Sequence, residues 1–450
     1  MTQLLGDSIV SALGFTSEEN YLNVKNGVSG LRFVADRYAM SEPFMASEID
    51  VERLEEEFGT AIKEWGRMSS DGYSKLEKAA IVSVVKALKQ CAISPASDRT
   101  LFVISTTKGN IECLSDGLDC FVPRNDGKGD RPDCFVPRFF FFACGKNDGV
   151  PDVPRNDGVH NVPRNDGKAD VFCNDDRLYL WRSAEKISRF FGNRNNPLVV
   201  SNACISGASA IIAARRELKA GRYDTVIVTG VDVLSEFIIS GFQSFKALSQ
   251  EVCKPFDANR NGLNLGEGAA TMILTESNSI EGVEVTSGAV RNDANHISGP
   301  SRTGEGAYLA LQSAVKDVNI NEIAFTNAHG TATQYNDEME SVALARAGLQ
   351  EVPVNSLKGY FGHTLGAAGI LESIISVYAL KDGIIPATYG FETSGVTYPI
   401  KIVKTPQPTT KRRFVKMLSG FGGCNAALLF TYNPDSEVTS NRESPARYQP

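Results

Sequence analysis

A cysteine stands at the start of a predicted helix, directly after a predicted strand. Cys204 lies in the segment SNACISGA at 201–208, which follows the apolar run 198–200. The positive end of a helix dipole favours a thiolate, which is the nucleophilic form of cysteine. A lone buried cysteine is more often an inert core residue, so its position alone does not establish a nucleophile.

Two of the four histidines in the chain occupy similar positions. His329 lies in NAHGTAT at 327–333, and His363 lies in SLKGYFGHTLGAAG at 356–369. Side chains at glycine-flanked strand ends project into clefts rather than into the core. Together with Cys204, these histidines indicate nucleophilic catalysis. A fourth motif, SGFGGCN at 419–425, is a glycine-rich turn that can direct backbone N–H groups to a developing oxyanion.

The elements that must position these residues alternate along the chain. Helical spacing of apolar residues predicts helices at 74–90, 178–191, 208–219, 307–318, 337–347 and 367–380. Short apolar runs predict strands at 101–104, 198–200, 225–228, 271–274 and 426–430. The alternation predicts an α/β protein with parallel sheets that helices cover on both faces.

A repetitive segment interrupts this pattern from about 119 to 176. The hexapeptide VPRNDG occurs at 122–127, 153–158 and 162–167. Units this short and polar do not form a solenoid, and they are typical of turns. We therefore expect a repetitive, largely disordered insert. The cysteines within it lack the paired spacing of zinc ligands, and we predict no metal site.

Composition narrows the class of protein. The chain has 450 residues, 42% of them hydrophobic, and a formal net charge of −7. A negative charge argues against nucleic-acid binding, and no apolar run is long enough to predict a membrane span. The first residues lack the basic segment of a secretory signal, and nine irregularly spaced cysteines are typical of reduced thiols. These features predict a cytoplasmic enzyme.

The four motifs together resemble those of the β-ketoacyl-ACP synthases, or ketosynthases, which are condensing enzymes of the thiolase-like fold. The resemblance runs from about residue 6 to residue 432, interrupted by the insert, and includes KPFDANRNG at 254–262. It implies two similar α/β halves, 1–275 and 276–433, followed by a polar tail, 434–450. The Cys-His-His set resembles the elongating type. That type carries out decarboxylative Claisen condensation of a Cys-bound acyl chain with malonyl-ACP in fatty acid, polyene or polyketide synthesis.

The resemblance also implies roles for individual residues. Cys204 would carry the acyl chain, while His329 and His363 would hold the malonyl thioester and stabilise its enolate. The backbone N–H groups of Cys204 and Phe421 would form an oxyanion hole, and Phe421 would gate the acyl pocket. No cofactor is implied, since the phosphopantetheine arm of acyl carrier protein brings the substrates. The implied partners are that carrier protein and a second ketosynthase subunit, in a homodimer or a heterodimer.

Further positions have a role in the family and a simpler alternative. Lys358 would organise the charge of the site with Glu372 as its partner, but it could instead be a solvated lysine, and Glu372 a helix-face carboxylate. Thr331 and Thr333 would contact the pantetheine arm, or they could only cap a turn. We interpret His296 as structural.

The chain departs from the family pattern at several places, which include residues 263–265 and the insert. It begins close to the first motif, so we expect a short first strand, and Lys108 stands where the family has a small or apolar residue. Three alternatives remain at this point. The first is a non-catalytic chain-length partner, which would lack the nucleophile. The second is a coenzyme A-dependent thiolase, whose second cysteine would correspond to Cys424, and the third is an enzyme inactivated by the insert.

Overall fold

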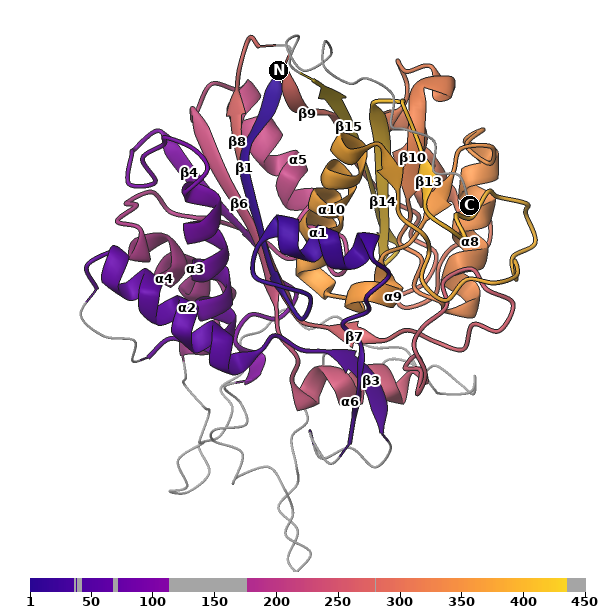
Figure 1. Cartoon of the computed structure of the whole chain (residues 1–450), viewed down its shortest axis with the longest axis horizontal. Coiled ribbons are helices and arrows are strands. Elements are labelled where there is room, and N and C mark those ends of the chain that lie inside the picture. The colour runs from indigo at the N-terminus through magenta and orange to yellow at the C-terminus, as the bar shows by residue number, and fades with distance from the viewer. Residues whose placement is uncertain (36–37, 39–42, 68–71, 113–175, 280, 435–450) are drawn as a thin grey trace, which may run out of the picture.

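The chain folds around one large mixed β-sheet with helices on both faces (Figure 1). The computed structural model describes residues 1–35, 38, 43–67, 72–112, 176–279 and 281–434. The helices are α1 (Ser17–Lys25), α2 (Val51–Glu64), α3 (Lys75–Leu88), α4 (Leu180–Phe190), α5 (Ser206–Lys219), α6 (Glu236–Ser244), α7 (Glu305–Ala314), α8 (Gln334–Arg346), α9 (Lys358–Phe361) and α10 (Ala368–Asp382). The strands of the large sheet are β1 (Thr2–Ser11), β4 (Thr100–Ser105), β5 (Leu198–Val200), β6 (Thr225–Asp232), β8 (Gly268–Glu276), β9 (Gly282–Asn292), β10 (Ile323–Asn327), β11 (Val354–Asn355), β14 (Arg413–Gly420) and β15 (Cys424–Asn433). Two small sheets contain β2 (Arg32–Val34), β3 (Phe44–Ser47) and β7 (Leu265–Gly266), and β12 (Ile384–Ile385) and β13 (Gln407–Pro408).

The large sheet consists of two five-stranded parts with the same pattern of strand directions. Its order is β11-β10-β14-β15-β9-β1-β8-β6-β4-β5, and Gln3 of β1 pairs with Glu284 of β9 where the parts meet. From β1 outward, two antiparallel pairings precede two parallel ones, and the same holds from β9 outward. We propose that the parts represent two similar halves of the chain, divided near residue 275.

The expectation of purely parallel sheets is therefore wrong for the middle of the sheet. Strands β14 and β15 are joined by the short turn 421–423, and strands joined by so tight a turn must run antiparallel. The expectation of a short first strand is also wrong. Strand β1 extends from Thr2 to Ser11 and pairs along its length with β8, where Ile9 and Val10 are fully buried.

Helices α5 and α10 form the layer that carries the site. They pack against each other and against strands of both parts of the sheet, in the largest apolar core. Helices α2, α3 and α4 cover the first part from the other side, and α7 and α8 cover the second (Figure 1). Every helix and strand predicted from the apolar pattern forms, with ends that shift by a few residues.

Glycines allow the two central helices to approach very closely at their N-termini. A Cβ atom on Gly369 would lie 2.3 Å from the backbone nitrogen of Ala208, and one on Gly207 would lie 3.0 Å from the Gly366 carbonyl oxygen. Only residues without a side chain fit at such distances. The close approach brings the turn that carries Cys204 next to the loop after His363.

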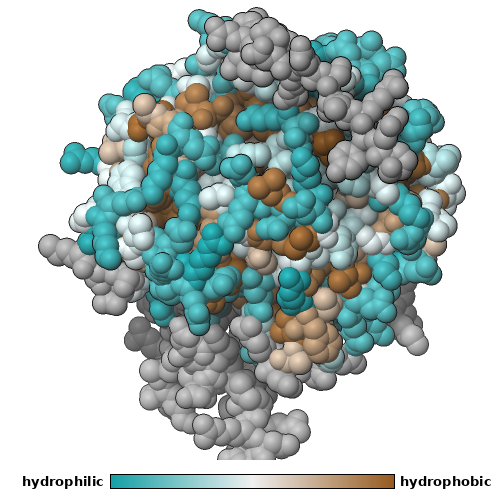
Figure 2. All heavy atoms as spheres, viewed as in Figure 1, coloured by the Kyte–Doolittle hydropathy of each residue, from teal (hydrophilic) through white to brown (hydrophobic). Residues whose placement is uncertain are grey.

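Polar side chains cover most of the face seen in Figure 2, with small apolar patches between them. Within the described ranges, none of the helices combines the length and the hydropathy needed to cross a bilayer. The predicted disordered insert lies outside the described residues, apart from Asp176 at its end, and so does the tail beyond residue 434.

Candidate active site

A strained turn between β5 and α5 presents Cys204. Ala203 adopts a positive φ of 45°, which is uncommon for a residue with a side chain. The Ser206 hydroxyl holds this turn, since it accepts the Asn202 N–H at 2.7 Å and donates to the Ala203 carbonyl oxygen at 2.6 Å. Strain maintained by surrounding bonds is common where a reactive side chain must be displayed.

The Cys204 thiol is neutral in the resting site. Its side chain is buried, and this burial raises the pKa of the thiol to about 12. We expected the start of α5 to favour the thiolate, but the loss of solvent on burial has the larger effect on this pKa. The backbone N–H of Phe421 hydrogen-bonds to the sulfur, which lowers the same pKa by a smaller amount. The nucleophile must therefore lose its proton as it attacks.

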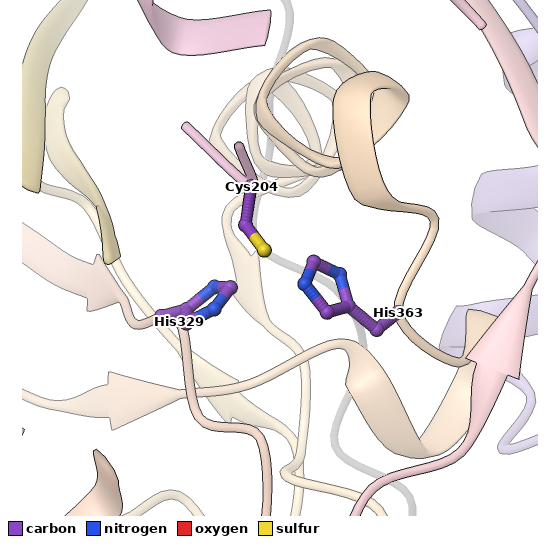
Figure 3. A group of neighbouring side chains, drawn as sticks. All are labelled: Cys204, His329 and His363. Atoms are coloured by element: carbon purple, nitrogen blue, oxygen red, sulfur yellow. The ribbon is translucent and has the colours of Figure 1, made fainter. Parts of the chain in front are cut away.

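His329 and His363 face Cys204 from two different elements (Figure 3). His329 follows β10, and His363 follows α9. The two ring centroids are 5.0 Å apart and the rings are nearly perpendicular. The Cys204 sulfur and one nitrogen from each ring all lie within 4.8 Å of one another. Three chemically active side chains distant in sequence thus meet at one point.

Backbone contacts orient both histidines. The Glu340 carboxylate accepts the N–H groups of His329 and Gly330 at 2.7 and 2.6 Å, which fixes the backbone that carries the first ring. The Nδ1 atom of His363 accepts the Leu365 N–H at 3.2 Å. In a neutral ring this bond assigns the proton to Nε2. That atom is buried and has no hydrogen-bond partner among the described residues, so its N–H can be donated to a substrate.

Both imidazoles are neutral at physiological pH. Burial is the main reason why the pKa of each ring lies well below its ordinary value of 6.5, and the nearby positive charge of Lys358 adds to the effect. A neutral imidazole can donate one hydrogen bond without introducing a full charge. Two such donors suit an oxygen that becomes negative during a reaction.

A buried ionic cluster stands behind the histidines. Lys358, at the start of α9, is fully buried and forms a salt bridge with Glu372 of α10. The second oxygen of that carboxylate accepts a hydrogen bond at 2.5 Å from Lys416 on β14. The positions of Lys358 and Glu372 thus exclude the alternatives of a solvated lysine and an exposed carboxylate.

Phe421 lies at the turn after β14, directly beside Cys204. A Cβ atom on Gly420 would be only 3.1 Å from the Cys204 backbone nitrogen, so glycine permits this approach. The Phe421 ring is 37% exposed, stacks on Phe242 at 5.9 Å and meets Phe245 edge-on at 5.7 Å. The backbone of Phe421 therefore lies next to Cys204, while its side chain is partly exposed at the surface.

A cavity of about 460 Å³ connects this point with the surface. Cys204, both histidines and Phe421 line it, as do Thr331, Thr333 and His296. The two threonine hydroxyls are hydrogen-bonded to each other at 2.8 Å, and Thr333 makes no side-chain cap on α8. The Thr333 side chain therefore does not cap helix α8. His296, which we interpreted as structural, lies on the cavity wall.

Comparisons with known proteins identify the family. Residues 181–279 match the model of the β-ketoacyl synthase N-terminal domain, and residues 283–392 match that of the C-terminal domain. Residues 181–392 of the chain therefore carry the two domains of the β-ketoacyl synthase family. The putative mitochondrial 3-oxoacyl-[acyl-carrier-protein] synthase of Schizosaccharomyces pombe is 31% identical over 269 residues, which are 54% of this chain and 63% of that protein. The 3-oxoacyl-[acyl-carrier-protein] synthase 2 of Vibrio cholerae is 32% identical over 268 residues, covering 55% of this chain and 65% of that protein. The matches thus span less than two thirds of these curated relatives.

Comparison with solved structures shows that the chain has the thiolase-like fold. A chain of the complex between the ketosynthase ApeO and its chain length factor ApeC from Xenorhabdus doucetiae gives a TM-score of 0.74 at 21% identity, and the match covers 96% of this chain and 98% of that one. The ishigamide ketosynthase/chain length factor gives 0.76 at 22% identity and covers 96% and 99%. At these identities the likeness concerns the fold alone.

Sequence reasoning missed three charged residues near this site. Lys416 is an isolated charge in the apolar strand β14, and that isolation was a usable signal. Glu340 acts on backbone groups, which no side-chain motif reveals. Asp232, at the end of β6, accepts the Gly366 N–H at 2.7 Å and pairs with buried Lys108 at 3.2 Å. The unusual Lys108 therefore has a partner in the fold.

The donor set of the site suits an anion better than a metal ion. Cys204, His329 and His363 offer three donor atoms within 4.8 Å, a spacing that a metal ion could use. However, Lys358 and Lys416 place positive charge behind both histidines. This charge opposes a divalent cation and attracts a substrate oxygen that gains negative charge.

Replacing Glu372 with glutamine should strongly destabilise the protein. The change keeps the shape but leaves two buried lysines without their shared counter-charge. Breaking a buried ion pair from one side costs about 3–5 kcal/mol, so we expect a loss of that size in the free energy of unfolding, measured with urea. Glu392→Gln is the control, because Glu392 forms an exposed pair with Lys404 and should change stability by less than about 1 kcal/mol. Equal losses in both variants would contradict the prediction.

Proposed function

We propose that the chain is a β-ketoacyl-ACP synthase that condenses a Cys204-bound acyl group with malonyl-ACP. The observation that carries the proposal is the meeting of a buried thiol with two neutral imidazoles at the inner end of the cavity. A thiol can hold an acyl group as a thioester, and two neutral donors can hold an enolate. The curated relatives named as 3-oxoacyl-[acyl-carrier-protein] synthases support the same activity.

The first half-reaction loads the enzyme. The Cys204 sulfur attacks the carbonyl carbon of an acyl thioester, and its proton passes to the departing thiol of the carrier. The oxyanion formed in between would accept the backbone N–H groups of Cys204 and Phe421. The Phe421 N–H already hydrogen-bonds to the sulfur, which supports this placement. The products are an acyl-cysteine thioester and the free carrier thiol.

The second half-reaction forms the carbon–carbon bond. The malonyl thioester loses CO₂, and the electron pair of the broken bond moves to the thioester oxygen as an enolate. The Nε2–H of His363 and a ring N–H of His329 would stabilise this oxygen. The enolate carbon then attacks the acyl-cysteine carbonyl, the sulfur of Cys204 leaves, and one proton from solvent restores the thiol. Because CO₂ departs without the electron pair of the broken bond, the enolate forms without removal of a proton. The reaction therefore requires no carboxylate base.

Partners follow from the same proposal. A carrier protein would deliver its arm through the cavity between Thr331, Thr333 and Phe421. A second subunit, identical or related, would complete the working unit. Among the described strands, β5 is the last at one edge of the large sheet, and its Leu198 is 37% exposed. An exposed apolar edge favours pairing with another chain.

Both alternative activities have less support. A non-catalytic chain-length partner would not need the thiol, the two histidines and the buried lysine that this chain retains together. A coenzyme A-dependent thiolase would place Cys424 in the reaction space. Among the described residues that line the cavity, Cys424 is absent, and its sulfur lies 3.2 Å from the Phe421 carbonyl oxygen.

The decisive experiment incubates the protein with acyl-ACP and malonyl-ACP and follows both carriers by mass spectrometry. We expect a β-ketoacyl-ACP two carbons longer than the donor, together with CO₂. Acetoacetyl-CoA with free coenzyme A provides the parallel test of thiolysis. Thiolysis without condensation would replace our proposal with the thiolase alternative, and neither activity would favour the non-catalytic partner.

A further inference from the structure

Lys416 is a fully buried lysine in the middle of the large sheet. It lies on β14, between β10 and β15, where its neighbours in the strand are apolar. A buried ammonium group requires hydrogen-bond acceptors to compensate for lost solvent. Its Nζ atom donates to Glu372 at 2.5 Å and to the Ala328 carbonyl oxygen at 3.2 Å, and the Asn327 carbonyl oxygen lies at 3.5 Å. These three acceptors compensate the buried ammonium group of Lys416 for its lost solvent.

These contacts connect Lys416 with both histidines. In the sheet register Lys416 pairs with Asn327, and Ala328 is the residue directly before His329. The ammonium group therefore holds the backbone from which the His329 ring projects. Through Glu372 it also holds Lys358, which begins the short helix that leads to His363. The Lys416 side chain thus contacts the segment that carries His329 directly and the segment that carries His363 through Glu372.

The cluster also gives the site one unit of positive charge. Two lysines share a single carboxylate, and all three groups are at most 1% exposed. A net positive charge in a dry interior stabilises negative charge that develops on a nearby oxygen. Burial lowers the pKa of Lys416 to about 8, so the group is charged at pH 7 and loses its charge as the pH rises through 8. The titratable groups that face Lys416 are Glu372 on α10, Lys358 on α9, Glu340 on α8 and the two neutral imidazoles of His329 and His363. Burial raises the pKa of Glu340 to about 7, so its carboxyl group offsets the positive charge of the cluster only in part at pH 7.

We propose that Lys416 is a positioning residue for enolate formation, which holds the backbone before His329 and supplies the second positive charge behind the two imidazoles. The inference rests on the proposed ketosynthase function. The inference goes beyond the proposed function because Lys416 touches no substrate. Lys416 acts through its contacts with Ala328 and Glu372 and through the electrostatic potential at the two histidines.

The test compares CO₂ release from malonyl-ACP by the full chain and by Lys416→Met. Methionine has a similar length and no charge, and Glu372 keeps its bond to Lys358. We expect kcat to fall roughly tenfold or more, the size that one unit charge can have across several ångströms of protein interior, with KM changed less than about threefold. The rate of the parent should decline as the pH passes 8, whereas the variant should show no such decline.

Two further variants separate this role from a structural one. Lys75→Met is the matched control, because Lys75 also pairs with a buried carboxylate, Glu267, at 2.5 Å but does not line the cavity. It should lower the melting temperature and leave kcat and the pH profile unchanged. Lys416→Gln serves if the methionine variant does not fold, since its amide still donates to Ala328.

The outcomes are distinct. A folded neutral variant with the kcat of the parent, or with a lowered kcat and the unchanged decline above pH 8, overturns the inference while the ketosynthase function stands. If neither neutral variant folds, Lys416 is structural and the inference also falls. A parent protein that releases no CO₂ and forms no product from any carrier-bound substrate contradicts the proposed function itself.

Discussion

Cys204→Ala should lose all acyl transfer and keep malonyl decarboxylation. The side chain that forms the thioester is gone, so intact-mass spectrometry should detect no acyl adduct after incubation with acyl-ACP. The two imidazoles that would hold the enolate are untouched, and the alanine removes only a sulfur from the inner end of the cavity. We therefore expect CO₂ release from malonyl-ACP within a few-fold of the parent rate, while no condensation product forms.

Two other cysteines make this experiment selective. Cys91→Ala is the control, because that thiol is only half-buried and does not line the cavity, and the variant should load acyl groups like the parent. Cys424 lies close enough to Cys204 to raise the pKa of the Cys204 thiol. An acyl adduct that persists on Cys204→Ala and disappears on additional replacement of Cys424 would assign the nucleophile to Cys424.

The residues that the sequence revealed are those whose position in a motif is itself informative. Cys204, His329 and His363 stand beside glycines at strand ends, and the structure brings them together. Lys358 and Glu372 were also recognised, because the resemblance to the family marks their positions. Their roles in the reaction remain predictions.

The residues that the sequence did not reveal act through contacts made only in the folded sheet. Lys416 meets Ala328 because β14 lies beside β10 in one register, although the residues are far apart in the chain. Glu340 was missed because it binds backbone N–H groups, which every residue has. Asp232 reaches the turn after His363 from another strand. Such pairings depend on topology, and local pattern carries no information about them.

The same limit applies to the fold. Apolar runs marked the strands β4, β5, β6, β8 and β15, but their periodicity contains no information about strand direction. The antiparallel centre of the sheet follows from how β1 and β9 enter it, and alternation of elements could not predict that arrangement. The burial of Cys204 is likewise a tertiary property, which is why its pKa rises although the helix start favours the thiolate.

His363→Ala should reduce malonyl decarboxylation by about 10²–10³-fold, the loss typical of one removed oxyanion donor. The Nε2–H of this ring is buried, has no hydrogen-bond partner in the described part of the chain and faces the Cys204 sulfur, so alanine leaves the enolate without this positioned donor. The measurement is single-turnover CO₂ release from malonyl-ACP. Because burial keeps the pKa of the ring well below 6.5, protonation of His363 itself should not lower the parent rate as the pH falls through 6.5.

The conservative variant His363→Asn distinguishes a lost donor from a damaged fold. An asparagine amide retains an N–H group near the same position, so this variant should recover part of the decarboxylation that alanine loses. Both variants should unfold at similar temperatures, since each removes the ring that accepts the Leu365 N–H. If both released CO₂ at the parent rate, His363 would not hold the enolate. If asparagine were no better than alanine at equal stability, its role would not be hydrogen-bond donation, and the neutral-donor mechanism would lose its main support.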